Sequence, residues 1–157
     1  MASFLYVTGL KEVLDQTHDI TAATNKVMLV KSGYVQDPDN DLVDAGGADD
    51  ALDHELTVSG YTGGHGGAGR KAWGTITVTA NKTDNRADVG VGADLTWTSL
   101  ATGETIAGAI LINEAGGADT STRLLCYWDI TDTPTTGGDV TLDFTPSASG
   151  GNIRISV

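Results

Sequence analysis

The segment "GYTGGHGGAGRK", residues 60–71, has the residue types of a loop that could bind phosphate, a metal or a substrate. From Gly64 it nearly matches a P-loop, because four residues separate Gly64 from Gly69 and a basic pair follows. A P-loop, however, places Lys and then Ser or Thr after its last glycine and opens a helix. Here Arg70 and Lys71 occupy those two positions, and the alternating sequence "KAWGTITVT" predicts a strand. We therefore expect a mobile, locally basic loop in which His65, Arg70 and Lys71 contact a partner.

A run of aspartates upstream has the pattern of a cation site. Asp37, Asp39 and Asp41 alternate as at the start of an EF-hand calcium loop. The pattern then breaks, because Leu42 stands where that loop needs glycine and no glutamate stands at its twelfth position. An Asx-rich turn in solvent is the favoured interpretation, and a calcium site at Asp37, Asp39 and Asp41 is the alternative. No cofactor is expected.

The residues that usually carry catalysis do not form a recognisable set. His18, His54 and His65 lie far apart without the spacing of zinc ligands, and no serine lies in a Gly-x-Ser-x-Gly motif. The single cysteine, Cys126, lies among apolar residues, which predicts a buried, unreactive thiol. We therefore expect a protein that is not an enzyme.

Aromatic residues suggest a different kind of surface. Tyr61 and Trp73 flank the glycine loop and are candidate partner contacts, or a platform for stacking sugars in a lectin-like module. Trp97 and Trp128 alternate with apolar residues, so we expect them in the core.

Composition and charge narrow the class of protein. The chain of 157 residues predicts one domain, and its 17 aspartates, 4 glutamates and 21 glycines favour turns and strands over helices. A net charge of −12 repels phosphate backbones, so nucleic-acid binding is not expected. The chain starts without a signal-peptide pattern and has no apolar stretch of membrane-spanning length, which predicts a protein made in the cytosol that contacts no membrane.

Only the N-terminal segment has helical periodicity. Phe4, Val7, Leu10 and Leu14 recur at spacings of three and four within residues 3–16. Residues 1–17 are therefore expected to form a short helix on the domain or an arm that binds a partner, with Phe4 and Leu5 as candidate contacts. Gly9 is expected to weaken the helix by about 1 kcal/mol relative to alanine.

The rest of the chain reads as short strands separated by turn residues. Within 123–130, Leu124, Cys126, Trp128 and Ile130 are expected on one face, with Leu125 and Tyr127 on the other. The fold class that follows is all-β: an antiparallel β-sandwich, jelly-roll-like, over residues 1–157. The predicted strands are 26–30, 74–79, 94–98, 105–112, 123–130, 139–144 and 153–157.

Several stretches, taken in order, resemble a family of small structural proteins encoded by tailed bacteriophages. They are "NKVMLVKSGY" (25–34), "VSGYTGG" (58–64), "LTWTSL" (95–100), "TIAGAILI" (105–112), "LLCYWDI" (124–130), "GGDVTLDF" (137–144) and the terminal "NIRISV". The long acidic loop at 37–53 and the glycines at 63–69 depart from the family's common form.

The resemblance implies a virion protein made in the bacterial cytoplasm and located on the capsid surface. Its implied role is capsid decoration or cement, with neck or tail attachment as the nearer alternative. The competing interpretation, which rests on Tyr61 and Trp73 and not on the resemblance, is a carbohydrate-binding module. The implied partners are the major capsid protein and further copies of the chain, as a homotrimer or dimer. The family supplies no catalytic residues.

Overall fold

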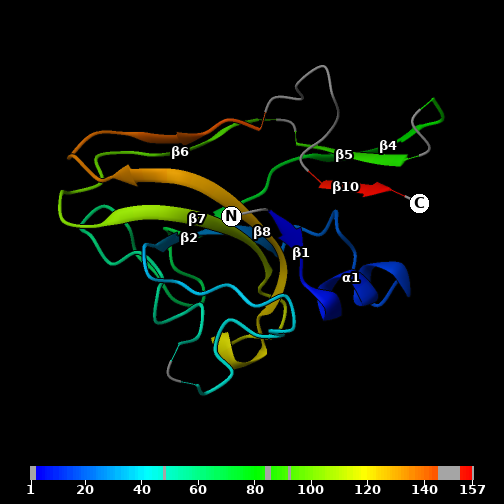
Figure 1. The fold of residues 1–157 in the computed structure, drawn as a ribbon, viewed down its shortest axis with the longest axis horizontal. Coiled ribbons are helices and arrows are strands. Elements are labelled where there is room, and N and C mark those ends of the chain that lie inside the picture. Colours follow the sequence, from blue (N-terminus) through cyan, green and yellow to red (C-terminus); the bar gives the residue numbers. More distant parts are fainter. Residues whose placement is uncertain (1–2, 48, 84–85, 92, 145–152, 157) are drawn as a thin grey trace.

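The computed structural model describes residues 3–47, 49–83, 86–91, 93–144 and 153–156 (Figure 1). Its helices are α1 (Val7–Leu14) and a short 3-10 turn at Asp119–Ser121. Its strands are β1 (Phe4–Leu5), β2 (Asn25–Lys31), β3 (Lys71–Ala72), β4 (Ile76–Asn81), β5 (Arg86–Val91), β6 (Leu95–Trp97), β7 (Thr105–Asn113), β8 (Arg123–Pro134), β9 (Val140–Leu142) and β10 (Ile153–Ser156). Among the described residues, no helix is long and apolar enough to span a membrane.

The central element is a five-stranded antiparallel sheet in the order β1-β8-β7-β2-β3. A second sheet has the order β10-β5-β4, and β6 pairs with β9 in a two-stranded ribbon. In Figure 1, β4, β5 and β10 lie together toward the end of the molecule that also carries α1. The structure confirms the predicted mainly-β, antiparallel class with a short N-terminal helix, and the jelly-roll likeness stays a prediction.

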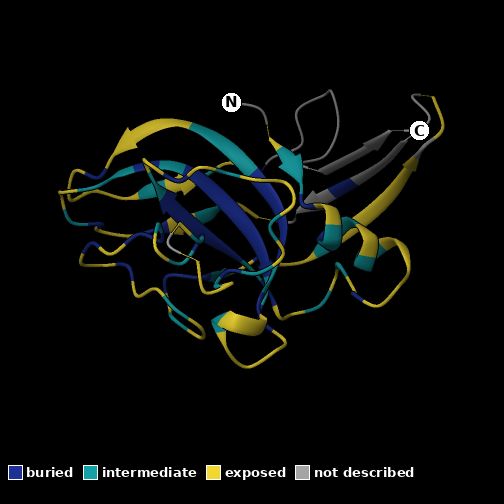
Figure 2. Ribbon diagram, turned by 60° about the horizontal axis from the view of Figure 1, so that its bottom comes forward, coloured by how far each residue is buried: buried dark blue, intermediate teal, exposed yellow. Residues whose placement is uncertain are grey.

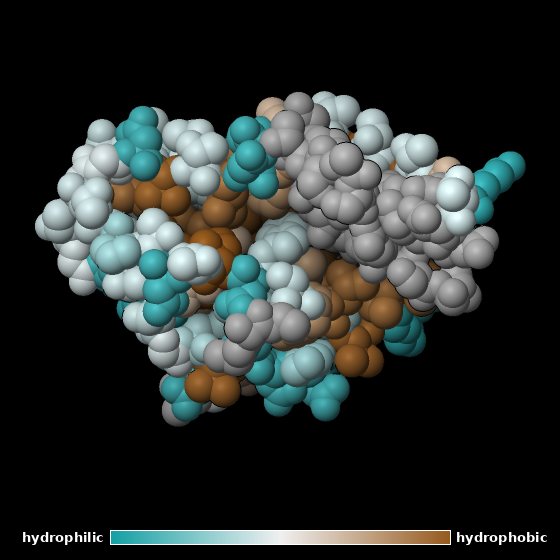
Figure 3. All heavy atoms as spheres, turned by 45° about the horizontal axis from the view of Figure 1, so that its top comes forward, coloured by the Kyte–Doolittle hydropathy of each residue, from teal (hydrophilic) through white to brown (hydrophobic). Residues whose placement is uncertain are grey.

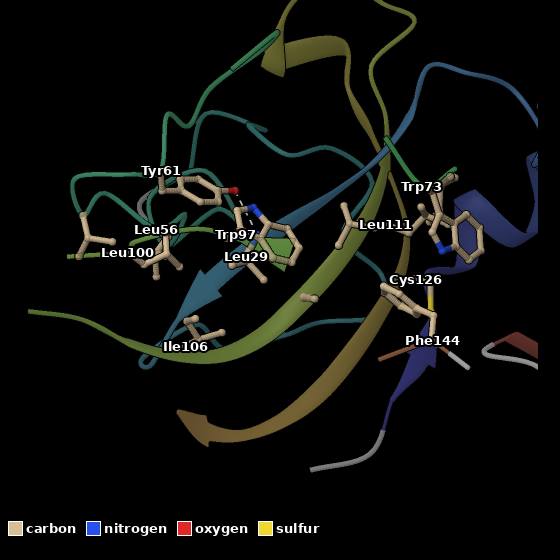
Figure 4. Close-up of a cluster of buried hydrophobic side chains, with 14 of the residues drawn as sticks. Leu29, Leu56, Tyr61, Trp73, Trp97, Leu100, Ile106, Leu111, Cys126 and Phe144 are labelled. Carbon is tan, nitrogen blue, oxygen red and sulfur yellow. Dashed lines mark hydrogen bonds between the residues drawn. The ribbon is translucent and has the colours of Figure 1, made fainter. Parts of the chain in front are cut away.

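Both faces of the five-stranded sheet are covered, which explains the continuous apolar sequences of β2 and β7. Val27 and Leu29 of β2 belong to one core, together with Trp97 of β6, and the partly buried Leu142 of β9 packs against it. Met28 and Val30 alternate with them and belong to a second core on the other face. The central strands are accordingly dark blue in Figure 2, and Figure 4 shows part of the first core.

The predicted strands recur with small shifts of their ends, but the assignment of faces along β8 was wrong at Leu124 and Leu125. The β7–β8 register shifts where Leu111 pairs with Cys126 and Ile112 pairs with Leu124, so Leu125 is an extra residue on β8. As a result Leu125 and Cys126 both lie in the first core, and Leu124 joins the second. Strand β5 was not predicted at all.

The N-terminal segment is part of the folded domain and does not form a free arm. Phe4 and Leu5 are half-buried in β1, which pairs with Tyr127 and Cys126 of the central strand β8. Tyr6, the next residue, is fully buried and its backbone N–H donates to the carbonyl of Leu125. Removing this segment would open the edge of the sheet.

Candidate functional site: the glycine loop around a buried arginine

The basic residue of the glycine loop points into the protein. The Arg70 side chain is fully buried and lies among three carboxylates from different parts of the chain. Its Nε and one terminal nitrogen donate to the two oxygens of Glu55 at 2.8 and 2.7 Å. The other terminal nitrogen donates to Glu114 at 3.0 Å and to Asp119. All three nitrogens of the guanidinium group therefore donate hydrogen bonds to these carboxylates.

The same carboxylates also bind the backbone of the glycine loop. The N–H of Gly64 donates to Glu55, that of His65 donates to Asp119, and that of Gly66 donates to Glu114, at 2.9, 3.0 and 3.4 Å. Successive backbone N–H groups of this kind form anion-binding nests in phosphate loops. Here the anions are carboxylates of the protein itself, so the loop binds its own side chains in the manner in which a P-loop binds phosphate.

Glycine is required in this loop because other groups approach the backbone closely. A Cβ added to Gly69 would lie 2.8 Å from the ring of Tyr61, and one added to Gly67 would overlap the carbonyl of Thr62. The Gly69 carbonyl in turn accepts a hydrogen bond of 2.6 Å from the indole of Trp97. The glycines therefore permit close packing around Arg70.

Tyr61 connects this ionic cluster to the first core. Its hydroxyl donates to Glu55 at 2.9 Å. The same hydroxyl accepts the backbone N–H of Leu29 at 3.1 Å (Figure 4). Burial, and then the negative charge of Glu55, raise the pKa of Tyr61 well above its ordinary value. The phenol therefore stays neutral and acts as a hydrogen-bond donor.

A second cation extends the cluster. Lys26 of β2 places its Nζ 2.6 Å from Glu114. Burial alone would raise the pKa of Glu114, but hydrogen bonds from Lys26 and Arg70 outweigh it and hold that pKa below its ordinary value. Three carboxylates thus face two cations. The arrangement clamps the glycine loop, β2 and the segment that follows β7, and it offers no unpaired nucleophile or base within this set.

The structure corrects the predicted exposure of the glycine loop. Arg70, Tyr61 and Trp73 are 3%, 6% and 1% exposed, so none of them presents its side chain to a partner. Lys71 is half-buried, with its Nζ 5.8 Å from the centre of the Trp97 ring. Of the predicted contact residues in and beside this loop, only His65 is exposed.

The predicted sugar-stacking platform is also corrected by burial. Tyr61 is held by Glu55 and Leu29, and Trp73 packs edge-on against Trp128 with their centroids 5.8 Å apart. Neither ring offers a free face of the kind that stacks on a sugar.

The aspartates proposed as a calcium site form a turn. The Asp39 N–H donates to the Asp37 side chain at 3.0 Å, and the Asn40 N–H donates to the Asp37 carbonyl. The Asp41 carbonyl accepts the N–H of Leu124. Within the described ranges, no group of three or more His, Cys, Asp or Glu residues is arranged to hold a metal ion.

Sequence reasoning missed the partners of Arg70. Glu55, Glu114 and Asp119 lie 15, 44 and 49 positions away, and nothing in their local sequences sets them apart from the other acidic residues. The available signal was the charge pattern: no Lys or Arg occurs at positions 32–69, so Arg70 ends a long acidic stretch.

Comparison with known proteins adds no identification. Searches against family models, curated proteins and solved structures found no significant match to this chain.

Proposed function

We propose that the protein is a non-enzymatic virion component that decorates or cements the head of a tailed phage. The ordered set of sequence stretches that resembles a phage structural family is the observation that carries the proposal. It runs from residue 25 to the C-terminus and includes the core strands β2, β7 and β8.

The architecture supports a binding module of fixed shape. Arg70 and its three carboxylate partners are the charged groups best suited to bind a ligand or act in catalysis. They form ion pairs with one another and stabilise a loop. Cys126 is buried, and burial raises its pKa to about 12, so its thiol is a poor nucleophile. A cement protein requires a rigid domain and a surface complementary to its capsid, and these features meet the first requirement.

The surface carries exposed apolar side chains among its polar ones. On the face shown in Figure 3, hydrophobic residues in brown lie in patches between hydrophilic residues in teal. Val7, Leu14, Val35 and Val78 are the large apolar residues most exposed among those described. Val7 and Leu14 lie on one short helix, and exposed apolar side chains grouped in this way support contact with a partner.

The test is binding to heads. Purified protein is mixed with expanded, empty heads assembled from the major capsid protein that is encoded with it, and the particles are sedimented and imaged by electron microscopy. We expect stoichiometric binding with density at symmetry-related positions on the head. Density only at the neck or tail, or no binding to particles, would contradict the decoration role.

A further inference from the structure

Several apolar side chains of helix α1 lie outside the part of the helix that packs against the core. Val7, Leu10 and Leu14 follow the i, i+3, i+7 spacing that normally faces a protein interior. The buried residue of the helix is instead Gly9. A Cβ at that position would overlap the Leu124 carbonyl of β8. The helix therefore packs directly against the backbone of β8 at Gly9.

This placement turns the apolar stripe toward solvent. Val7 is 56% exposed and Leu14 is 63% exposed, although they begin and end a single short helix. Together with Leu10, Lys11 and Asp15 they line a shallow hollow on the surface. We call these five residues the α1 surface. An apolar stripe at helical spacing that borders a hollow is the form in which helices commonly contact a partner protein.

The charges around the α1 surface indicate which partner fits. The Val7 N–H donates to the Pro38 carbonyl at 3.0 Å, which places the turn containing Asp37 and Asp39 at the start of the helix. Both aspartates are exposed, and neither makes an ion pair within the described part of the chain. The one basic residue of the helix, Lys11, is paired with Asp15 at 2.7 Å.

A second copy of the chain fits this surface poorly. A two-fold contact over the α1 surface would bring the same aspartates of both copies together, and each copy carries a net charge of −12. Like charges brought together in this way oppose association. A surface with apolar side chains flanked by Lys or Arg is complementary both to the stripe and to the unpaired acidic turn.

We propose that the α1 surface, with Asp39 beside its N-terminal end, is where this protein docks, and that its partner is a basic-rimmed apolar patch on the phage head. This inference rests on the proposed decoration function and assigns the contact surface for it.

The experiment compares substitutions on the α1 surface with matched substitutions elsewhere, using the same empty heads as the probe. Leu14→Glu is matched by Val78→Glu, because Val78 is 56% exposed on β4. Asp39→Lys is matched by Asp132→Lys, because both carboxylates are exposed and Asp132 lies near the far end of β8. Each variant keeps its fold contacts, which circular dichroism and thermal unfolding verify.

We expect Leu14→Glu to weaken binding to heads by about tenfold or more, and Asp39→Lys to slow association severalfold. Both control variants should stay within about twofold of the wild type. If wild-type protein binds heads and Leu14→Glu binds equally well, the docking surface is wrong while the decoration function stands. If wild-type protein does not bind heads, both proposals fail. If ultracentrifugation shows a wild-type dimer that Leu14→Glu dissociates, a second copy occupies the surface and the proposed partner is wrong.

Discussion

Arg70 lies in the protein interior because carboxylates distant in sequence converge on it. An isolated buried charge is strongly unfavourable, so the fold depends on the hydrogen bonds from Arg70 to Glu55, Glu114 and Asp119. Removing the arginine leaves three carboxylates in a site built for a cation. The side chain that appeared best suited to contact a partner is thus an internal structural element.

We expect Arg70→Met to lower the free energy of unfolding by about 3 to 5 kcal/mol, because it leaves buried carboxylates without their counter-charge. Arg123→Met is the matched control. Its partner is the half-buried Glu12 at 3.1 Å, and the more exposed position of Arg123 limits its effect to about 1 kcal/mol. Urea unfolding measures the free energy of unfolding of the two variants and of the wild type.

Arg70→Lys provides a milder test if the methionine variant does not fold. Lysine keeps the charge but loses the bidentate contact with Glu55, so an intermediate loss of stability is expected. Equal stability of Arg70→Met and Arg123→Met would show that the buried cluster is not a major source of stability.

Burial and the contact with Asn113 favour the neutral form of His18. The Asn113 Oδ1 accepts the N–H of Ala115, so the Asn113 amide nitrogen is the atom that faces His18 Nδ1, at 2.7 Å. Nδ1 must therefore be an acceptor, and a proton there would oppose a second donor. Burial lowers the pKa of His18, against the upward effects of Asn25 and of the carboxylates of Glu12 and Asp19.

The stability of the fold should consequently fall in mild acid. The pKa of folded His18 lies below its ordinary value of 6.5. The unfolded chain therefore takes up a proton first, and the stabilisation present above pH 6.5 declines as the pH falls toward the folded pKa. Urea unfolding at pH 7.5 and 5.5 should show a larger loss for the wild type than for His18→Gln. Equal losses in the two proteins would refute a neutral His18 in the fold.

At the scale of elements, close approaches determine where glycine is needed. Gly9 permits α1 to lie on β8, and Gly108 of β7 leaves room for the ring of Tyr127, which a Cβ at position 108 would approach to 2.5 Å. Helix propensity predicts that Gly9 weakens α1, but the contact with β8 gives glycine a positive role there. Whether a substitution of Gly9 raises or lowers the free energy of unfolding tests which effect is larger.

We expect Gly9→Ala to destabilise the protein by about 1 to 3 kcal/mol, because the new methyl group must push α1 away from the backbone of β8. Thr8→Ala in the same helix is the control, and propensity predicts a gain of about 0.5 kcal/mol for it. Thermal unfolding of both variants decides the question. A Gly9→Ala protein more stable than the wild type would mean that propensity outweighs the contact.

The N-terminal elements also restrict how the docking proposal can be tested. Deleting residues 1–16 would remove the fully buried Tyr6, whose hydroxyl lies 2.9 Å from that of Tyr34, together with the β1 edge of the sheet. Such a deletion would perturb the fold as well as the α1 surface. Exposed positions such as Leu14 are therefore the informative ones.

For the whole molecule, the dominant property is the distribution of charge. Lys11, Lys26, Lys31, Arg70 and Arg123 are all ion-paired within the chain. The acidic stretch at 37–53 contains no Lys or Arg. The surplus negative charge is thus left to face solvent or a partner, and it should attract a basic surface over a range of about 10 Å at 0.1 M salt.

Binding to heads should weaken as salt is added, mainly through slower association. Raising the ionic strength from 0.05 to about 0.5 M should lower the association rate more than it changes the dissociation rate, since screening acts on the approach of the charges. Surface-bound heads and stopped-flow fluorescence give both rates. An association rate independent of salt would contradict a basic partner surface.

Local patterns in the sequence determined the mainly-β class, the positions of most strands and the burial of Cys126. These follow from alternation, apolar runs and turn residues, which act over a few positions. The tertiary structure alone decided three other features: the register shift beside Leu125, the side of α1 that packs on β8, and the carboxylates that enclose Arg70. The physical reason is that a buried charge or a flush contact depends on groups brought together from distant positions, and the local sequence around Arg70 does not specify them.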